Sequence, residues 1–95
     1  MMFAVTCFDK PDHASVRTAN RPAHLEYLKA NAASIRIAGP LLTDDGGGMV
    51  GSLLLVEAPD RAAAEAVLSD DPYAKAGLFA STDIRPWRWV IGAPA

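Results

Sequence analysis

The chain has 95 residues, of which 51% are hydrophobic and 21% are charged, and its formal net charge is −2 at pH 7. This composition excludes an intrinsically disordered chain, and the length allows one domain, which we assign to residues 1–95. The weak negative charge, without any cluster of basic residues, argues against a protein that binds nucleic acid.

The first predicted element is a buried strand over residues 1–8. Its sequence, MMFAVTCF, is short and apolar, and it is closed by charge and a proline. The segment carries no basic leader, and no apolar run in the chain approaches the roughly 20 residues that span a bilayer. Cys7 is the only cysteine, so no internal disulfide forms. We therefore expect a cytoplasmic protein that does not enter membranes, with Cys7 as an inert buried side chain.

A helix is predicted over residues 13–33, a segment rich in Ala, Leu, Glu, Lys and Arg, with Asp12 as its N-cap. Its apolar face is expected to follow helical spacing. The residues assigned to that face are Val16, Ala19, Ala23, Tyr27 and Ala30, widened by Leu25 and Leu28. Pro22 interrupts the pattern, so either the helix bends near Asn20, or a short turn precedes a main helix that has Pro22 in its first turn.

Two strands joined by a glycine-rich turn follow. The first covers residues 34–42, where Gly39-Pro40 marks a bend or an edge position. Residues 43–48, TDDGGG, predict a hairpin turn, because Asp-Gly followed by further glycine favours the backbone conformations that such turns need. Residues 49–58 form the next strand, which we expect to pair antiparallel with the strand before the turn.

The last third of the chain contains a second helix and a final strand. Asp60 can cap a helix whose alanine-rich sequence, RAAAEAVL, has high helical propensity. A further helical turn is predicted over residues 73–78. The final strand is predicted over residues 79–91, where strand alternation directs Trp87 and Trp89 to one face as core or interface residues.

The order β-α-β-β-α-β predicts an α+β fold of the ferredoxin-like type, in which an antiparallel sheet carries two helices on one face. The strands are apolar on both sides, as the run Leu53-Leu54-Leu55-Val56 shows. A strand that is hydrophobic on both faces requires cover on both, and the helices cover only one. We therefore expect a second copy of the chain to cover the other face, in a homodimer or a higher oligomer.

An ordered set of short motifs runs through these elements. In chain order, the motifs are Arg21-Pro22-Ala23-His24-Leu25, Gly39-Pro40-Leu41, Gly51-Ser52, Asp71-Pro72-Tyr73, Ala76-Gly77-Leu78 and Arg85-Pro86-Trp87. Each motif is weak alone, but together, in this order and at this spacing, they resemble the YciI-like family. The resemblance implies a ferredoxin-like fold and a dimer whose sheets pack face to face in an α/β-barrel-like assembly.

The resemblance also implies an active site centred on a histidine and an aspartate, which are His24 and Asp71 in this sequence. Most members of the family have no assigned reaction. One related member removes HCl from a chlorinated hydroxyhydroquinone, which shows a reaction that the fold can host. The activity of this chain has to be argued from its own site, because one fold serves many functions.

The chemistry of His24 and Asp71 fits such a site. Histidine titrates near neutral pH and serves as a proton shuttle. A carboxylate that accepts a hydrogen bond from one ring nitrogen fixes the tautomer and frees the other nitrogen as a base. The alternatives are a histidine at the edge of the core and an aspartate that caps the following turn. Asp70 competes with Asp71, which we prefer because it occupies the Asp-Pro position of the family.

Four further side chains are assigned to substrate binding, namely Arg21, Tyr27, Ser52 and Tyr73. Arg21 and Tyr27 each lie three residues from His24, so all three share one side of a helix. Arg21 would hold an anionic group, or would instead pair with Glu26 or an acidic loop. The two tyrosines would line a pocket or pack in the core, and Ser52 would bind a ligand or simply begin a strand.

These residues indicate an enzyme that carries out general acid–base chemistry on a small molecule, either ring-containing or anionic, as a lyase, a dehydrochlorinase or a hydrolase-like enzyme does. The Cys and His spacing fits no zinc site, and the glycine turn lacks the lysine of a phosphate-binding loop. We therefore expect no metal and no organic cofactor. Two alternatives remain open: a non-catalytic dimeric module that binds a small ligand, and an interaction domain without a ligand.

Overall fold

The computed structural model describes residues 1–94; Ala95, the last residue of the predicted domain, lies outside the described residues. The elements in chain order are β1 (Met2–Asp9), α1 (Ala14–Ala30), β2 (Ile35–Leu42), β3 (Met49–Glu57), α2 (Arg61–Ser69), α3 (Pro72–Lys75) and β4 (Phe79–Trp87). The predicted element order is confirmed, and the short α3 is the helical turn expected after the second helix.

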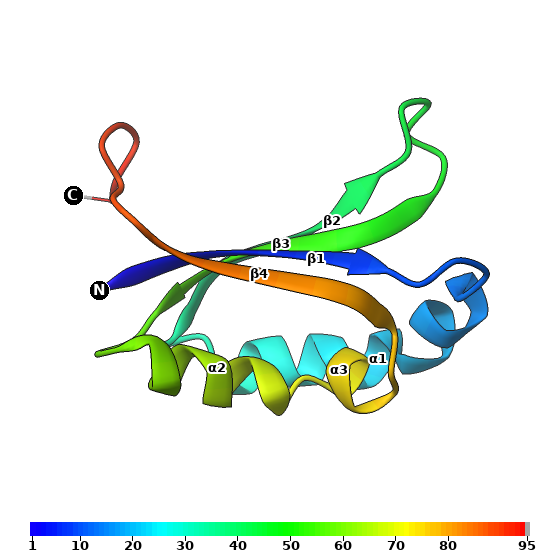
Figure 1. Ribbon diagram of the computed structural model, residues 1–95, viewed down its shortest axis with the longest axis horizontal. Coiled ribbons are helices and arrows are strands. Elements are labelled where there is room, and N and C mark those ends of the chain that lie inside the picture. Colours follow the sequence, from blue (N-terminus) through cyan, green and yellow to red (C-terminus); the bar gives the residue numbers. More distant parts are fainter. Residues whose placement is uncertain (95) are drawn as a thin grey trace.

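The four strands form one antiparallel sheet in the order β2-β3-β1-β4, with β2 and β4 at its edges. The helices lie together on one face, and within residues 1–94 no helix covers the opposite face (Figure 1). This arrangement confirms the predicted ferredoxin-like α+β fold. Pro40 and Pro86 lie in the two edge strands, where a missing backbone N–H is tolerated.

The hydrophobic core lies between the sheet and the helices. Alternate residues of the two central strands point into it: Phe3, Val5 and Cys7 from β1, and Leu54 and Val56 from β3. Helix α2 adds Ala64 and Leu68. Because strand side chains alternate, the residues between these positions point to the face without helices.

The β2–β3 hairpin forms as predicted. The backbone N–H of Thr43 donates to the carbonyl of Gly48 over 2.8 Å, and Gly46 has a φ of 76°, which favours glycine. Further along β3, a Cβ at position 51 would collide with the backbone oxygen of Cys7 on β1. Gly51 is therefore required for the close approach of the two central strands.

Helix α1 corrects the prediction at both ends and excludes one of the two alternatives for Pro22. Asp12 is not the N-cap, because it adopts a left-handed conformation with φ 59°, and His13 takes the cap position without a side-chain capping bond. Pro22 lies inside one helix of 17 residues, so the alternative of a separate turn before Pro22 is wrong. The helix ends at Ala30, three residues before the predicted end. Among the described residues no helix has the length and hydropathy to cross a membrane.

The buried face of α1 carries two charged or hydrogen-bonding side chains, and of the predicted apolar face only Tyr27 is fully buried. Its buried residues are Arg17, His24 and Tyr27. The residues predicted for the buried face that are instead exposed are Ala19, Ala23, Leu25 and Ala30. An alanine methyl group buries little apolar area, so the hydrogen-bond partners of Arg17 and His24 decide the rotation of the helix at small cost. Packing on both sides of Pro22 against one sheet also explains why the proline does not divide the helix.

Strand β4 ends at Trp87 and not at residue 91. Trp87 pairs with Met2, the first residue of β1, so β1 offers no partner to residues beyond it. Trp89 therefore lies outside the strand, and the prediction that strand alternation directs both tryptophans to one face is wrong. The two rings still lie near each other, with centroids 5.6 Å apart.

Candidate functional site

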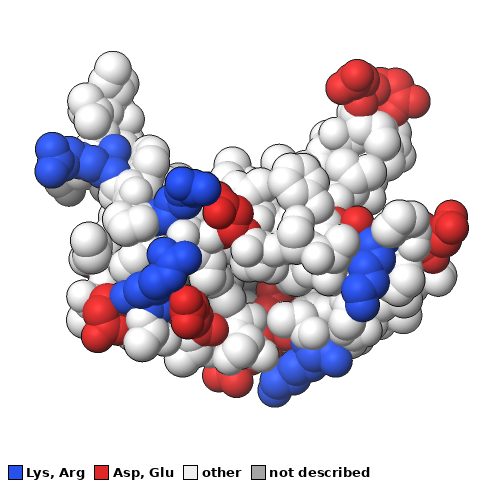
Figure 2. All heavy atoms as spheres, viewed as in Figure 1, with Lys and Arg blue, Asp and Glu red and all other residues white. Residues whose placement is uncertain are grey.

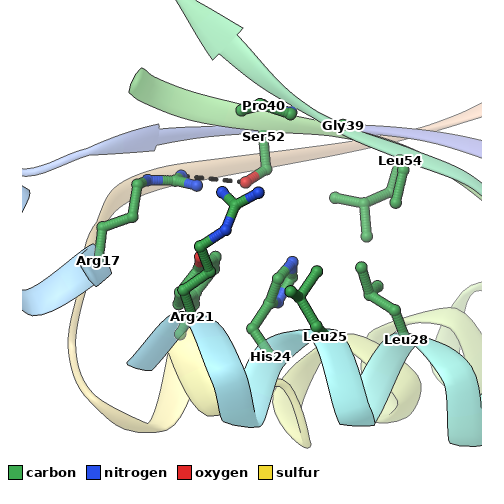
Figure 3. Close-up of a pocket in the computed structure, with 11 residues that line it drawn as sticks. Arg17, Arg21, His24, Leu25, Leu28, Gly39, Pro40, Ser52 and Leu54 are labelled. Carbon is green, nitrogen blue, oxygen red and sulfur yellow. Dashed lines mark hydrogen bonds between the residues drawn. The ribbon is translucent and has the colours of Figure 1, made fainter. Parts of the chain in front are cut away.

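A cavity of about 150 Å³ lies between α1 and the strands β2 and β3 (Figure 3). Leu25, Leu28 and Leu54 form its apolar wall. Its polar side chains are those of Arg17, Arg21, His24, Ser52 and Tyr73. An apolar wall beside a few charged and hydrogen-bonding groups is typical of a small-molecule site.

The structure brings His24 and Asp71 together. Nδ1 of His24 lies 2.8 Å from Oδ1 of Asp71, and both residues are buried. His24 comes from the middle of α1, whereas Asp71 is the N-cap of α3, where the same Oδ1 also accepts from the backbone N–H of Tyr73 over 2.9 Å. Asp70 is exposed. Because the carboxylate accepts, Nδ1 carries the proton, and the lone pair of the imidazole lies on Nε2.

Tyr73 packs directly on the histidine. The two rings are stacked, with centroids 3.9 Å apart and planes inclined by 13°. Phe79 packs edge-to-face against the ring of Tyr73, with the two centroids 6.2 Å apart. One short segment thus supplies both the carboxylate that orients His24 and the ring that fixes its plane, so the imidazole is held rigidly at the cavity.

Arg17 and Asp9 form a buried ion pair that the sequence analysis missed. Nε and Nη2 of Arg17 donate to the two carboxylate oxygens of Asp9 over 2.7 and 2.9 Å, and Nη2 also donates to Oγ of Ser52 over 3.1 Å. The hydrogen bond to Asp9 raises the pKa of Arg17, which stays charged. Its guanidinium carbon lies 4.7 Å from the centroid of the Tyr73 ring. A signal was present, because Arg17 precedes His24 by seven residues and therefore shares its helix face.

Arg21 points into the cavity toward Ser52 (Figure 3). The predicted alternative of a salt bridge to Glu26 is not formed, since Glu26 pairs with Lys29 on the surface. Among residues 1–94, the side chain of Arg21 forms one hydrogen bond, from Nη1 to Sδ of Met49 over 3.4 Å. Arg21 is exposed as a residue, and no carboxylate of residues 1–94 pairs with it, so it is available to a ligand.

Tyr27 is used differently from the other predicted residues. Its hydroxyl donates to the backbone carbonyl of Val67 on α2, and the side chain belongs to the hydrophobic core cluster. The residues that line the cavity within the described chain do not include Tyr27. Its position therefore favours the packing alternative, in which it joins α1 to α2. The described residues also contain no group of three or more His, Cys, Asp or Glu side chains placed to hold a metal ion.

Comparison with known proteins places this chain in a family. The model of the YCII-related domain matches residues 1–88. This chain belongs to the YCII-related, or YciI-like, family. The resemblance seen in the sequence motifs is thereby confirmed.

Relatives cover nearly the whole chain. Protein YciI of Escherichia coli is 30% identical, and the match covers 96% of this chain and 100% of the relative. An uncharacterized protein of Haemophilus influenzae has the same identity and coverage. Among solved structures, 5-chloro-2-hydroxyhydroquinone dehydrochlorinase from Burkholderia phenoliruptrix, in complex with 2,5-dihydroxybenzoquinone, is 37% identical with a TM-score of 0.84. That match covers 93% of this chain and 94% of the dehydrochlorinase.

Proposed function

We propose that this protein is an enzyme in which His24 transfers a proton and Asp71 orients it. The observation that supports the proposal is the 2.8 Å hydrogen bond between the two side chains at the wall of a cavity. Since Nδ1 is bound to the carboxylate, Nε2 is available to take a proton from a molecule in the cavity. We place this activity in the cytoplasm, which suits a chain whose single cysteine is a free thiol.

The substrate in this proposal is a small molecule with a single ring. The cavity of about 150 Å³ has the size of an engineered cavity that holds one benzene molecule. The related dehydrochlorinase was solved with a single-ring compound. We infer an elimination in which His24 accepts the proton and the leaving group departs as an anion, while Arg21, Ser52 and Tyr73 bind the substrate. This reaction requires neither a metal nor an organic cofactor.

Chloride release from 5-chloro-2-hydroxyhydroquinone and from other chlorinated phenols tests the proposal. The wild-type protein is expected to release chloride, and His24→Gln and Asp71→Asn are each expected to slow release by about 10²- to 10⁴-fold. His13→Gln, which changes the other histidine of the chain, is the control and keeps the wild-type rate. Binding without turnover of any of these compounds would favour the non-catalytic ligand-binding module. Equal rates in all variants would contradict the role of His24.

We also propose that two copies of the chain pair through the sheet face that carries no helix. Phe8, Ile37, Leu53 and Trp87 are 51, 43, 43 and 39% exposed, which is unusual for large apolar side chains in strands. The β2–β3 hairpin and the C-terminal segment both rise beyond this face (Figure 1). Between them the surface is mostly uncharged (Figure 2). A second copy of the same apolar face is the occupant that would bury it by self-complementary contact.

Sedimentation velocity tests the pairing. Wild-type protein is expected to sediment as a dimer or a higher oligomer, and Leu53→Glu is expected to sediment as a monomer, because a charge would be buried in the interface. Ala62→Glu places the same charge on the exposed surface of α2 and leaves the oligomer intact. A wild-type monomer, or a Leu53→Glu variant that remains oligomeric, would contradict this interface.

A further inference from the structure

Tyr73 is a buried tyrosine beside the guanidinium of Arg17. The residue is 1% exposed, and its oxygen is the one buried side-chain polar atom of residues 1–94 that lacks a hydrogen-bond partner. An unpaired buried hydroxyl destabilises a folded protein, so its presence beside a cavity points to a partner that the chain itself does not supply. Burial raises the pKa of Tyr73, so the hydroxyl keeps its proton and acts as a donor.

Ser52 offers a second donor to the same cavity. Its Oγ accepts a hydrogen bond from Nη2 of Arg17, so its own proton is free to point elsewhere. A hydroxyl that accepts from a charged guanidinium becomes a stronger donor, because hydrogen bonds in a chain polarise one another. Ser52 is 4% exposed and lines the cavity, so a ligand there would meet this hydroxyl away from bulk water.

Two arginines make this end of the cavity positive. Asp9 balances the charge of Arg17 and fixes its guanidinium with two hydrogen bonds. Arg21 forms no salt bridge within the described chain, and it points toward Ser52 from α1, the helix that also carries Arg17 (Figure 3). A negatively charged oxygen at this position would therefore meet a guanidinium that no protein carboxylate neutralises.

We propose that Ser52 and Tyr73, supported by Arg17 and Arg21, form a receptor for an oxyanion of the substrate. The ligand class is a small ring compound with a phenolic or enolisable oxygen. This inference rests on the proposed function and deepens it, since it names the group that receives the negative charge while His24 receives the proton.

The step balances without a co-reactant. Nε2 of His24 takes a proton from a C–H or O–H bond of the substrate, and the electron pair of that bond moves onto the ring oxygen. The oxygen becomes an enolate or a phenolate and accepts hydrogen bonds from the two hydroxyls. The reaction thus creates an imidazolium and an oxyanion together, and preorganised donors aimed at the new charge stabilise it.

Binding of para-nitrophenol tests the receptor, because the phenolate form of this probe is yellow and the neutral form is not. At a pH below the pKa of the free phenol, wild-type protein is expected to bind the probe as the yellow phenolate. Para-nitroanisole has the same ring but cannot ionise, and it is expected to bind at least tenfold more weakly. Ser52→Ala and Tyr73→Phe are each expected to weaken phenolate binding by roughly 10- to 100-fold.

The two tyrosines of the chain provide matched variants. Tyr73→Phe removes a hydroxyl without a partner, so its thermal unfolding temperature is expected to stay at the wild-type value or rise. Tyr27→Phe removes a hydroxyl that bonds to Val67, so its unfolding temperature is expected to fall while phenolate binding is kept. A receptor role for Tyr73 predicts this opposite pattern, which a purely structural role does not.

The remaining outcomes separate this inference from the proposed function. If wild-type protein binds the probe only in its neutral form, or not at all, or if Ser52→Ala and Tyr73→Phe bind it as tightly as wild type, the receptor is wrong. If phenolate binding follows these expectations but no substrate shows turnover that depends on His24, the proposed function fails and the receptor stands.

Discussion

Helices α1 and α2 lie against the same face of the sheet, yet they bury opposite kinds of side chain. Helix α2 buries Ala64 and Leu68, which join the hydrophobic core. Helix α1 buries Arg17, His24 and Tyr27, each of which needs a hydrogen-bond partner. The apolar face packs against whatever apolar surface it meets, whereas the polar face can be buried only where partners are supplied.

Those partners come from distant parts of the chain. Asp9 is the last residue of β1, Ser52 lies in β3 and Asp71 caps α3, and all three bond to side chains of α1. The cavity lies on this polar side of the helix layer. Packing is therefore less close on the α1 side, where the charged and hydrogen-bonding side chains surround the cavity. The layer between the sheet and the helices therefore has two halves: the hydrophobic core on the α2 side and the candidate site on the α1 side.

Removal of a partner on the α1 side is expected to have the largest effect on stability. Asp9→Asn leaves the charge of Arg17 buried without its counter-ion and should lower the free energy of unfolding by about 3–5 kcal/mol. Glu57→Gln breaks the exposed pair with Arg36 and should cost less than about 1 kcal/mol. Urea unfolding of both variants measures the difference. Equal losses would show that burial does not distinguish the two pairs.

On the α2 side, Leu68→Ala is expected to lower the free energy of unfolding by roughly 2–4 kcal/mol, because it removes buried methyl groups and leaves a void. The side chain of Leu68 takes no part in the hydrogen bonds around His24; only its backbone carbonyl, which the substitution keeps, accepts from the backbone N–H of Asp71. We therefore expect wild-type binding of para-nitrophenol in this variant at temperatures where it is folded. A large loss of binding in the folded variant would show that the two halves are coupled.

Cys7 lies at the border of the two halves, opposite Ser52 in the β1–β3 register. Burial raises its pKa from 9.0 to about 11. Below pH 9 the thiol is protonated in both states; between pH 9 and pH 11 the unfolded chain loses the proton while the folded chain keeps it, so stability falls as pH rises. The loss attributable to Cys7 is about 2 kcal/mol over this range.

Unfolding of the wild type and of Cys7→Ala across this pH range isolates the contribution of the thiol. The variant is expected to be less stable at neutral pH because it is smaller, but its stability should fall less steeply from pH 9 upward. The tyrosines titrate in both proteins, so they cancel in the difference. Parallel pH profiles would contradict a raised pKa at Cys7.

The smallest expected effect concerns the helix ends. Asp60 caps α2, since its Oδ1 accepts from the backbone N–H of Ala63 over 2.8 Å, and Asp60→Ala should cost about 1 kcal/mol. His13 occupies the same position before α1 but makes no capping bond, because its Nδ1 lies 2.7 Å from the carbonyl of Pro11. His13→Ala should therefore cost less. Thermal unfolding compares the two, and equal shifts would contradict the capping role of Asp60.

Local signals in the sequence determined the elements of this protein and their order. The hairpin follows from TDDGGG, the start of α2 from Asp60 and the edge position of β2 from Gly39-Pro40, because turns, caps and proline act within a few residues. The alternation of buried residues in β1 also follows from the geometry of a strand. The pair His24 and Asp71 was predicted from family motifs. The predicted fold alone indicated only that the two side chains could be close enough to interact.

The tertiary structure alone decided which face of α1 is buried and where β4 ends. Hydrophobic periodicity predicted that the alanines of α1 would be buried. The hydrogen-bond partners of Arg17 and His24 lie up to 47 positions away in the sequence, so no local pattern predicts these bonds. The same long-range pairing limits β4, since β1 offers no partner beyond Met2. Burial of a charged or hydrogen-bonding side chain depends on partners that only the folded chain brings together. For that reason the sequence did not show that Asp9 and Arg17 form a buried pair, although the seven-residue spacing places Arg17 on the helix face of His24.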